Sequence, residues 1–245
     1  MDEIDEIIAY CTRIEPGFPQ GLHGSSAADI AALEQALGKP CSPLYRKFLS
    51  TMGDGIDALQ MGSYSTRPAE LADRGADQLR GLVDGVELFA VSDLDDEDIF
   101  LVAREPRETL IVAHASSNAH TPPFDAEQGG IVAGSLSQLV CLPVFSRVRV
   151  LPLRYRAEFV ATEVGPDYLV HLSRVAADVG AKAAWFSDST AYVGEVESVV
   201  IVGKQSPTSY FSLGVAADDA WSCVAVLAAL ARAFDEAQLG LDRTR

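Results

Sequence analysis

The stretch SPLYRKFLSTMGDG, residues 42–55, decides the fold of the first half of the sequence. Ser42 can accept a hydrogen bond from a backbone N–H at a helix N-terminus. Pro43 fits the first helical position, because an N–H there has no partner within the helix. Four apolar side chains then follow at the i, i+3, i+4, i+7 spacing of one helix face: Tyr45, Phe48, Leu49 and Met52. The pattern therefore predicts a helix that begins at Pro43 and packs one face into a core.

A Gly-Asp-Gly turn closes this stretch. We expect Gly53 to end the helix in the left-handed conformation and Gly55 to allow a second tight turn, since glycine adopts such conformations without steric cost. The aspartates of the continuing chain, Asp54 and Asp57, are then held at the rim of the core rather than buried in it.

Helix and strand patterns around this stretch predict an α+β fold for residues 1–150. Apolar residues at helical spacing predict a helix over 3–14, and a capping pattern at Ser26 and Asp29 predicts another that ends at Gly38. Segments rich in strand formers predict an antiparallel sheet packed against these helices: 86–92, 98–104, 109–115 and 129–135. Two further segments are expected to be helical, at 71–85 (a short helix and a turn) and 135–145.

The pattern restarts at the basic segment SRVRVLPLRYR, so we place a domain boundary near residue 150 and divide the chain into 1–150 and 151–245. The second domain is expected to hold a strand over 158–163, a helix over 166–179 and a last helix that starts near Asp218 or Asp219. Four more strands are expected from the segments AAWFSDS, AYVGEVE, SVVIVGK and SYFSLGV. This order predicts a smaller α+β domain with an antiparallel sheet and helices on one face.

The charge of the chain is strongly unbalanced. Nineteen Lys and Arg stand against 35 Asp and Glu, which gives a formal net charge of −16. Residues 53–98 alone carry 12 acidic and three basic side chains, over half of the net charge. Such a surface repels phosphate backbones and attracts a basic protein, so we expect a protein partner and no nucleic acid. A purely solubilising role for the acidic residues is the alternative.

The cysteines and the apolar runs predict a cytoplasmic protein without a membrane segment. The four cysteines lie far apart with no CxxC pair, as is usual for reduced thiols packed as small hydrophobes. The acidic start of the sequence lacks the basic region of a signal peptide, and the longest apolar run, residues 223–234, is too short to cross a bilayer.

Short motifs between about Ile30 and Gly55 carry a resemblance to a known family. They are Leu-Glu and Leu-Gly in one helix, a proline before an aromatic residue, Phe-Leu, and a glycine turn. The residues concerned are Leu33, Glu34, Leu37, Gly38, Pro43, Tyr45, Phe48, Leu49, Gly53 and Gly55. With DIFLVA and GGIVAGSLSQL further on, they resemble the SUKH superfamily over roughly residues 25–145. Cys41-Ser42 stands where that family has Leu-Pro, and Met52 where it often has asparagine.

The resemblance implies a non-catalytic binding protein. SUKH proteins are largely immunity proteins against bacterial polymorphic toxins, often nucleases, and they include a fungal cell-wall-synthesis regulator. Toxin nucleases tend to be basic because they bind polyanions, so an acidic protein can occupy the same surface. The expected contact residues are Asp54, Asp57, Asp93, Asp95, Asp96, Glu97, Asp98, Asp125 and Glu127.

Motifs for catalysis and for metal binding are weak or missing. GDGIDA, residues 53–58, matches the spacing of a dinucleotide-binding turn but follows a helix instead of a strand. SDLDDEDIF, residues 92–100, alternates carboxylates as calcium loops do, without their glycine and terminal glutamate. His114 and His120 flank ASSNA, which is either a nucleophile site or an ordinary polar loop. We expect no enzyme activity, no cofactor and no metal.

Two rival functions stay open. Residues 151–245 could form an enzyme or a ligand-binding domain, which requires a pocket with converging polar groups. The chain could also be a regulatory scaffold that binds several proteins of its own cell. The aromatic residues of the second domain are either core or a contact patch: Trp185, Phe186, Tyr192, Tyr210 and Phe211.

Overall fold

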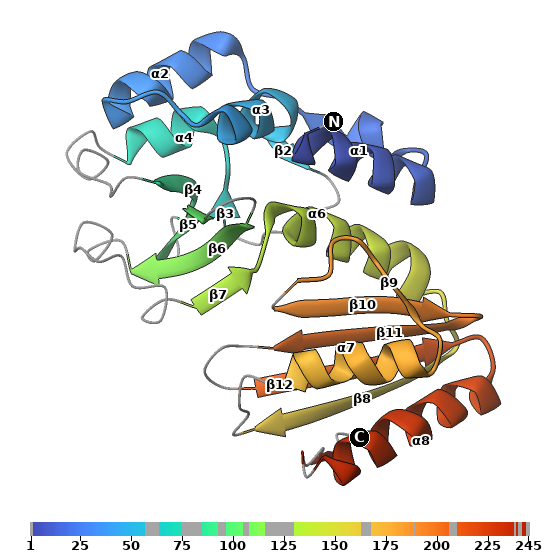
Figure 1. Cartoon of the computed structure of the whole chain (residues 1–245). Coiled ribbons are helices and arrows are strands. Elements are labelled where there is room, and N and C mark those ends of the chain that lie inside the picture. The colour runs from blue at the N-terminus through green and yellow to red at the C-terminus, as the bar shows by residue number, and fades with distance from the viewer. Residues whose placement is uncertain are drawn as a thin grey trace. The chain divides into compact units, whose positions relative to one another are not determined.

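The structure is a computed structural model that describes residues 2–56, 64–74, 85–92, 97–104, 108–115, 130–162, 168–188, 190–205, 210–237, 239 and 242–243. The chain divides into two compact units, called here unit 1 (Met1–Val144) and unit 2 (Phe145–Arg245). Each unit combines helices with antiparallel β-sheet (Figure 1). The predicted α+β fold is therefore confirmed.

The helices of unit 1 follow the predicted pattern closely. They are α1 (Glu3–Ile14), the 3-10 turn η1 (Phe18–Gly21), α2 (Ala27–Leu37), α3 (Pro43–Met52), α4 (Pro68–Asp73) and α6 (Leu136–Phe145). Ser26 caps α2 by accepting the Asp29 N–H, and Gly38 ends that helix in the left-handed conformation at φ 70°. The helix expected over 71–85 begins earlier, at Pro68, and residues 75–84 lie outside the described part of the chain.

A five-stranded antiparallel sheet forms the rest of unit 1. Its strands lie in the order β3 (Tyr64–Ser65), β4 (Val86–Ser92), β5 (Glu97–Arg104), β6 (Glu108–Ala115) and β7 (Gly130–Ala133). The four strands expected from the sequence are thus confirmed. All seven residues of β4 are buried, which explains why its sequence does not alternate between apolar and polar residues.

The N-terminus of α3 is fixed to β4 by a buried carboxylate. Both the backbone N–H and the Oγ of Ser42 donate to the Glu87 carboxylate at 2.7 Å. The same Oγ accepts the Tyr45 N–H at 3.3 Å, so Ser42 is the predicted N-cap. Because Glu87 is only 7% exposed, these two bonds provide the polar partners that a buried carboxylate requires.

The apolar face of α3 packs as its spacing predicts. Tyr45, Phe48, Leu49 and Met52 are all buried. The Phe48 and Phe89 rings lie 4.8 Å apart between centroids, and the Tyr45 hydroxyl donates to the Leu88 carbonyl at 2.5 Å. Ring packing and this hydrogen bond therefore join α3 to the middle of β4.

Gly53 does not have the left-handed conformation that we expected. It lies in the right-handed region at φ −67° and ψ −27°. Lack of space excludes a side chain there instead, because a Cβ would lie 2.6 Å from both the Leu49 carbonyl oxygen and the Ser25 Oγ. The positive φ belongs to Gly55, at 138°, which begins β2 (Gly55–Ile56). This strand pairs with β1 (Leu22–His23) in a small sheet that the sequence did not predict.

Unit 2 is built on a six-stranded antiparallel sheet. Its elements are the π-helical turn η3 (Ser146–Val150), β8 (Tyr155–Thr162), α7 (Tyr168–Asp178), β9 (Lys182–Ala183), β10 (Ala191–Val196), β11 (Val199–Gln205), β12 (Tyr210–Ala217), α8 (Ala220–Glu236) and β13 (Asp242–Arg243). The strand order is β13-β8-β12-β11-β10-β9. The boundary that we expected near residue 150 falls at Phe145, since η3 follows α6 without a loop and belongs to unit 2.

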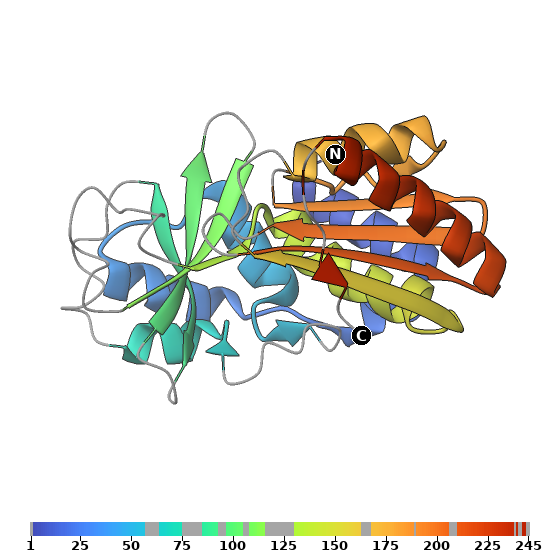
Figure 2. The same ribbon diagram turned by 90° about the horizontal axis from the view of Figure 1, so that it is seen from below.

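Helices α7 and α8 cover one face of this sheet (Figures 1 and 2). Leu172, Leu230 and Phe234 from the helices and Phe211 and Leu213 from β12 are fully buried between the layers. The Tyr168 ring lies 5.3 Å from that of Phe211 and 5.9 Å from that of Phe234, between centroids. The predicted arrangement of helices on one face is therefore confirmed.

The segment AAWFSDS is not the strand that we expected. Only Lys182–Ala183 pairs with β10, and a turn follows through Trp185. The turn is held by Asp188, whose Oδ1 accepts the N–H groups of Thr190 and Ala191 at 2.8 and 3.1 Å. Side-chain hydrogen bonds of this kind compete with strand pairing of the backbone.

In the described ranges, no helix combines the length and the apolar character that a membrane crossing requires.

Replacement of Gly53 by alanine is expected to destabilise unit 1 by about 2 kcal/mol, the usual cost of an extra carbon in a packed site. The new Cβ meets the α3 backbone, which cannot move without loss of the helix. Urea denaturation followed by circular dichroism measures the change. Both tryptophans, Trp185 and Trp221, lie in unit 2, so their fluorescence follows unit 2 separately.

Gly17→Ala is the matched control. A Cβ at Gly17 would have its nearest neighbour at 4.0 Å, and its φ of −79° suits any residue. We expect the free energy of unfolding of this variant to lie within about 0.5 kcal/mol of that of the parent chain. Equal unfolding midpoints for the two variants would show that the space at Gly53 is not restrictive.

Candidate functional site

The predicted acidic contact lies only partly in the described chain. Asp54 is described in full, and the backbone of Glu97 begins β5. The other expected contacts lie outside the described residues, except Asp98, which is treated below: Asp57, Asp93, Asp95, Asp96, Asp125 and Glu127. The structure therefore does not test whether these acidic residues form one surface.

Asp54 is exposed and held on a fixed turn. Its N–H donates to the His23 carbonyl at 2.8 Å, and its carboxylate accepts the Ser25 Oγ at 2.7 Å. Ser25 is buried and donates its own N–H to the Leu49 carbonyl of α3. The charge of Asp54 is thus positioned by the C-terminal end of α3, at the rim of the core as the sequence predicted.

Asp98 is not an exposed contact residue. It is 3% exposed, and its Oδ1 accepts the Nη2 of Arg74 at 2.6 Å and the Nε at 3.2 Å. The Arg74 Nη2 also donates to the Ser92 carbonyl at the end of β4. This buried ion pair joins the segment after α4 to the ends of β4 and β5, so the expectation for Asp98 is wrong.

Four basic side chains of unit 1 are paired with its own acids. Arg46 pairs with Glu34, and Lys47 donates to both Asp2 and Asp5 at 2.6 Å. These hydrogen bonds raise the pKa of Lys47, and the bond from Lys47 is the main cause of the lowered pKa of Asp2. Arg67 and Arg74 pair with Glu70 and Asp98. Two other described cations are not in these ion pairs: Arg13 lies over the Tyr10 ring and Lys39 donates to the Val86 carbonyl. Asp54 and Asp73 are exposed.

The cysteines do not provide a nucleophile. Burial, with smaller effects of Glu87 and Glu34, raises the pKa of Cys41 to about 12. The contact with Cys11, at 3.8 Å between sulfur atoms, and burial raise the pKa of Cys141, and burial raises that of Cys223. All four thiols are free and buried. A thiol with a raised pKa is a poorer nucleophile, so Cys41, Cys141 and Cys223 are suited to packing rather than to reaction.

Two of the four histidines, His23 and His171, have described side chains, and they lie in different units. His171 lies on α7, where its Nε2 is 3.1 Å from the Ala233 carbonyl and its ring packs edge-on against Phe234. His114 lies in β6 opposite Asp98, its side chain is not described, and His120 lies outside the described residues. Within the described ranges, no three His, Cys, Asp or Glu side chains are close enough to hold a metal ion.

Unit 2 contains a hollow on the face of its sheet that α7 and α8 do not cover. Its volume is about 480 Å³, and its floor is formed by β8, β11 and β12. The register places two rows of side chains across the three strands. Val200, Ala216 and Arg156 form one row, and Val202, Gly214 and Glu158 form the next. Val150 of η3 forms one wall.

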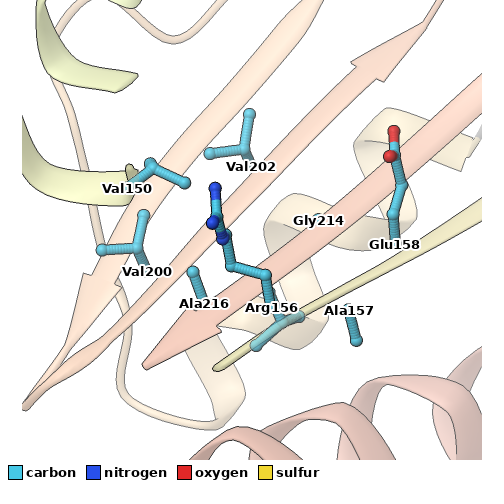
Figure 3. A pocket seen from close by; sticks show the side chains of 9 residues that line it. Val150, Arg156, Ala157, Glu158, Val200, Val202, Gly214 and Ala216 are labelled. Carbon is cyan, nitrogen blue, oxygen red and sulfur yellow. The ribbon is translucent and has the colours of Figure 1, made fainter. Parts of the chain in front are cut away.

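The two charged residues of the hollow point in different directions. In Figure 3 the Arg156 guanidinium extends over the valines, between Val150 and Val202, while Glu158 points away from it. No ion pair joins Arg156 to another side chain in the described chain. Gly214 leaves the centre open, because a Cβ there would meet only the Val202 carbonyl oxygen at 3.7 Å. The hollow therefore combines an apolar floor with one cation, Arg156, and one carboxylate, Glu158.

The aromatic residues of unit 2 divide between core and surface. Phe186, Tyr192 and Phe211 are buried, whereas Trp185 and Tyr210 are 43% and 44% exposed. Trp221, on α8, is 82% exposed and was missed by the sequence reasoning. The sequence does contain a signal for this exposure. The segment AWSCVAVLAALA has apolar residues around most of the helix, and only one side of a helix can pack on a sheet.

The residues that carry the family resemblance have structural positions. Leu33, Leu37, Tyr45, Phe48 and Leu49 are buried, and Glu34 accepts the Cys41 N–H at 2.9 Å besides pairing with Arg46. Comparison with models of known protein families and with curated proteins finds no match. The relationship to the SUKH superfamily thus stays a prediction from short motifs.

Proposed function

We propose that this chain is a non-catalytic protein that binds and neutralises a basic protein, as an immunity protein does with a toxin domain. The observation that carries the proposal is the charge distribution. The net charge is −16, and four described cations of unit 1 are already paired with its own carboxylates. Among the described acids of unit 1, Asp54 and Asp73 are exposed, and Asp54 holds its carboxylate on a fixed turn.

The physical reason is electrostatic competition. A basic nuclease domain exposes positive charge to attract phosphates, and an acidic protein attracts the same surface and excludes the substrate. Such an encounter is fast at low salt and slows as salt screens the charges. A regulatory scaffold predicts several weaker partners, whereas neutralisation predicts one dominant basic partner.

Charge reversal of Asp93, Asp95 and Asp96 to lysine is expected to leave the fold intact and slow partner association about tenfold or more, since rim charges act mainly on the association rate. The partner is first recovered with the full chain from host lysate at low and at high salt. Its association is then measured by surface plasmon resonance across a salt series. The matched control reverses Asp178, Glu197 and Glu236, which are exposed in unit 2. Equal effects of the two triple variants would contradict a local acidic contact.

A single substitution at Asp54 tests the described part of the acidic surface. Asp54→Asn keeps an oxygen that can accept the Ser25 Oγ but removes the charge, so we expect slower association, about twofold, with unchanged stability. Asp54→Ala removes the hydrogen bond as well and is expected to lower stability by about 1 kcal/mol. If the asparagine variant associates like the parent chain at low salt, Asp54 is outside the contact.

The hollow of unit 2 supports a second candidate function, the binding of a small ligand with an apolar body and one anionic group. Its volume is within the roughly 300–1,000 Å³ of small-molecule sites, and Val150, Val200 and Val202 match an apolar body. The Arg156 guanidinium makes no ion pair with a described acid, so it can donate to a ligand carboxylate without displacing one.

Octanoate is a suitable probe of this hollow, with octylammonium as the comparison of opposite charge. We expect octanoate alone to shift the amide NMR signals of β8, β11 and β12. Arg156→Gln should weaken its binding about tenfold by loss of a charge-assisted bond. Gly214→Leu should abolish binding, because the added side chain fills the hollow without straining the backbone. Glu158→Gln is the control and should bind octanoate at least as well as the parent chain. Equal binding of both probes would contradict the role of Arg156.

A further inference from the structure

One wall of the hollow in unit 2 is a turn that the core does not hold. The wall is η3, which contributes Val150. None of the five residues of η3, all of which the structure describes, is buried. Leu151, the next residue, is 59% exposed. The position of Val150 therefore depends on interactions other than packing into the core.

The first end of η3 is anchored by an aromatic contact. Phe145 directly precedes η3, is 2% exposed, and its ring lies 6.1 Å from that of Phe186 between centroids. From there η3 continues α6 as a π turn, in which the Leu151 N–H donates to the Ser146 carbonyl at 2.8 Å. A π turn contains one more residue than an α turn and occurs frequently at functional sites. The end that carries Val150 needs a second attachment.

An ion pair supplies that attachment. The Nε and Nη2 of Arg149 lie 3.0 and 2.9 Å from the Glu195 Oε1 on β10. Two N–H groups of one guanidinium thus donate to the same carboxylate oxygen, and such charge-assisted bonds are stronger than neutral ones. Because Arg149 directly precedes Val150 in the chain, this contact also holds the backbone of Val150 at the hollow.

The sheet places Glu195 in the same row as the floor of the hollow. Glu195 lies opposite Val200 of β11. Val200 in turn lies opposite Ala216 of β12, which lies opposite Arg156 of β8. Residues paired in this way share one face of a sheet, so the row crosses four strands and spans about 14 Å. Arg156 therefore stands at one end of the row and the Arg149–Glu195 pair at the other, with apolar residues between them.

We infer that the Arg149–Glu195 ion pair positions Val150 as the wall of the hollow and thereby sets how tightly the hollow binds the apolar body of a ligand. Arg149 and Glu195 are positioning residues, while Arg156 receives the anionic group. The inference rests on the second candidate function, because it concerns how the same hollow is held ready for a ligand. A wall that is already in place loses less conformational entropy when the ligand binds.

The effect of this ion pair is local. The Arg149 and Glu195 side chains are 52% and 40% exposed, and exposed pairs contribute little to global stability. We therefore expect loss of the pair to leave the unfolding midpoint of unit 2 unchanged. The expected change is more frequent local opening of η3, because its residues have no buried contact that would replace the pair.

Amide hydrogen exchange of the ligand-free full chain tests the positioning directly. Arg149→Gln and Glu195→Gln should each speed exchange of the Leu151 N–H about threefold, as loss of an exposed ion pair allows. The double variant should exchange no faster than either single variant, because the two residues act through one contact. Arg149→Lys keeps a charged donor and should exchange more slowly than Arg149→Gln.

Arg154→Gln is the matched control. Arg154 belongs to the same basic segment, but its guanidinium lies over the Tyr155 ring, 5.5 Å from the centroid, and it does not line the hollow. The variant removes the same charge, and we expect exchange of the Leu151 N–H to stay at the rate of the parent chain.

A charged and a neutral probe separate positioning from direct contact. Octanoate and 1-octanol have apolar bodies of similar length, and only octanoate carries a charge. Titrations followed by the amide NMR signals of β8, β11 and β12 give both affinities. Arg149→Gln should weaken both probes by the same factor, about threefold, because it acts through the wall. Arg156→Gln should weaken octanoate alone, because Arg156 contacts the anionic group.

Three outcomes would overturn the inference: unchanged exchange of the Leu151 N–H in both single variants, equal acceleration by Arg154→Gln, or weakening of octanoate alone by Arg149→Gln. The last result would make Arg149 a ligand contact. A parent chain that binds octanoate but not 1-octanol also contradicts the inference, because the apolar body then contributes too little for the wall to matter.

Failure of the second candidate function gives a different result, in which neither probe binds the parent chain. The affinity part of the inference then fails with it, and the exchange rates alone decide whether the ion pair positions η3.

Discussion

The carboxylate of Glu87 is the group on which the arrangement of unit 1 depends. A carboxylate with 7% exposure is destabilising unless it accepts strong hydrogen bonds, and it obtains two from Ser42 at the start of α3. The N-terminal end of a helix also favours a negative charge. Removal of either partner would leave a buried group unsatisfied, so α3 can take only one position along β4.

That single position determines where the acidic turn lies. The Tyr45, Phe48 and Phe89 rings fill the space between α3 and β4, and the other end of α3 meets Ser25 and Gly53 with no room for a side chain at Gly53. The Asp54 carboxylate follows directly and accepts the Ser25 Oγ. A charge fixed in this way loses little conformational entropy on binding, which is the advantage of placing it on a turn between packed elements.

The sequence predicted the features that depend on neighbouring residues and missed those that depend on distant ones. The caps at Ser26 and Ser42, the spacing of the α3 face and the strands of the larger sheets are local patterns, and the structure confirms them. The burial of Asp98 depends on Arg74, 24 residues earlier, so the acidic run around Asp98 was predicted to contact a partner. The hollow in unit 2 arises from the register of three strands, which no single segment encodes.

The charge distribution also determines which kinds of partner the surface of this molecule can bind. At −16, two copies repel each other over most of their surface, so self-association is possible only where charge is locally balanced and apolar area is available. Helix α8 meets only the second condition: Trp221 is 82% exposed, but the exposed charged residues of this helix and its cap are mostly acidic, namely Asp218, Asp219, Asp235 and Glu236 against Arg232. Added salt weakens the general repulsion between copies and the attraction to a basic protein alike. A basic partner therefore has the electrostatic advantage over a second copy at low salt, and that advantage falls as salt screens the charges.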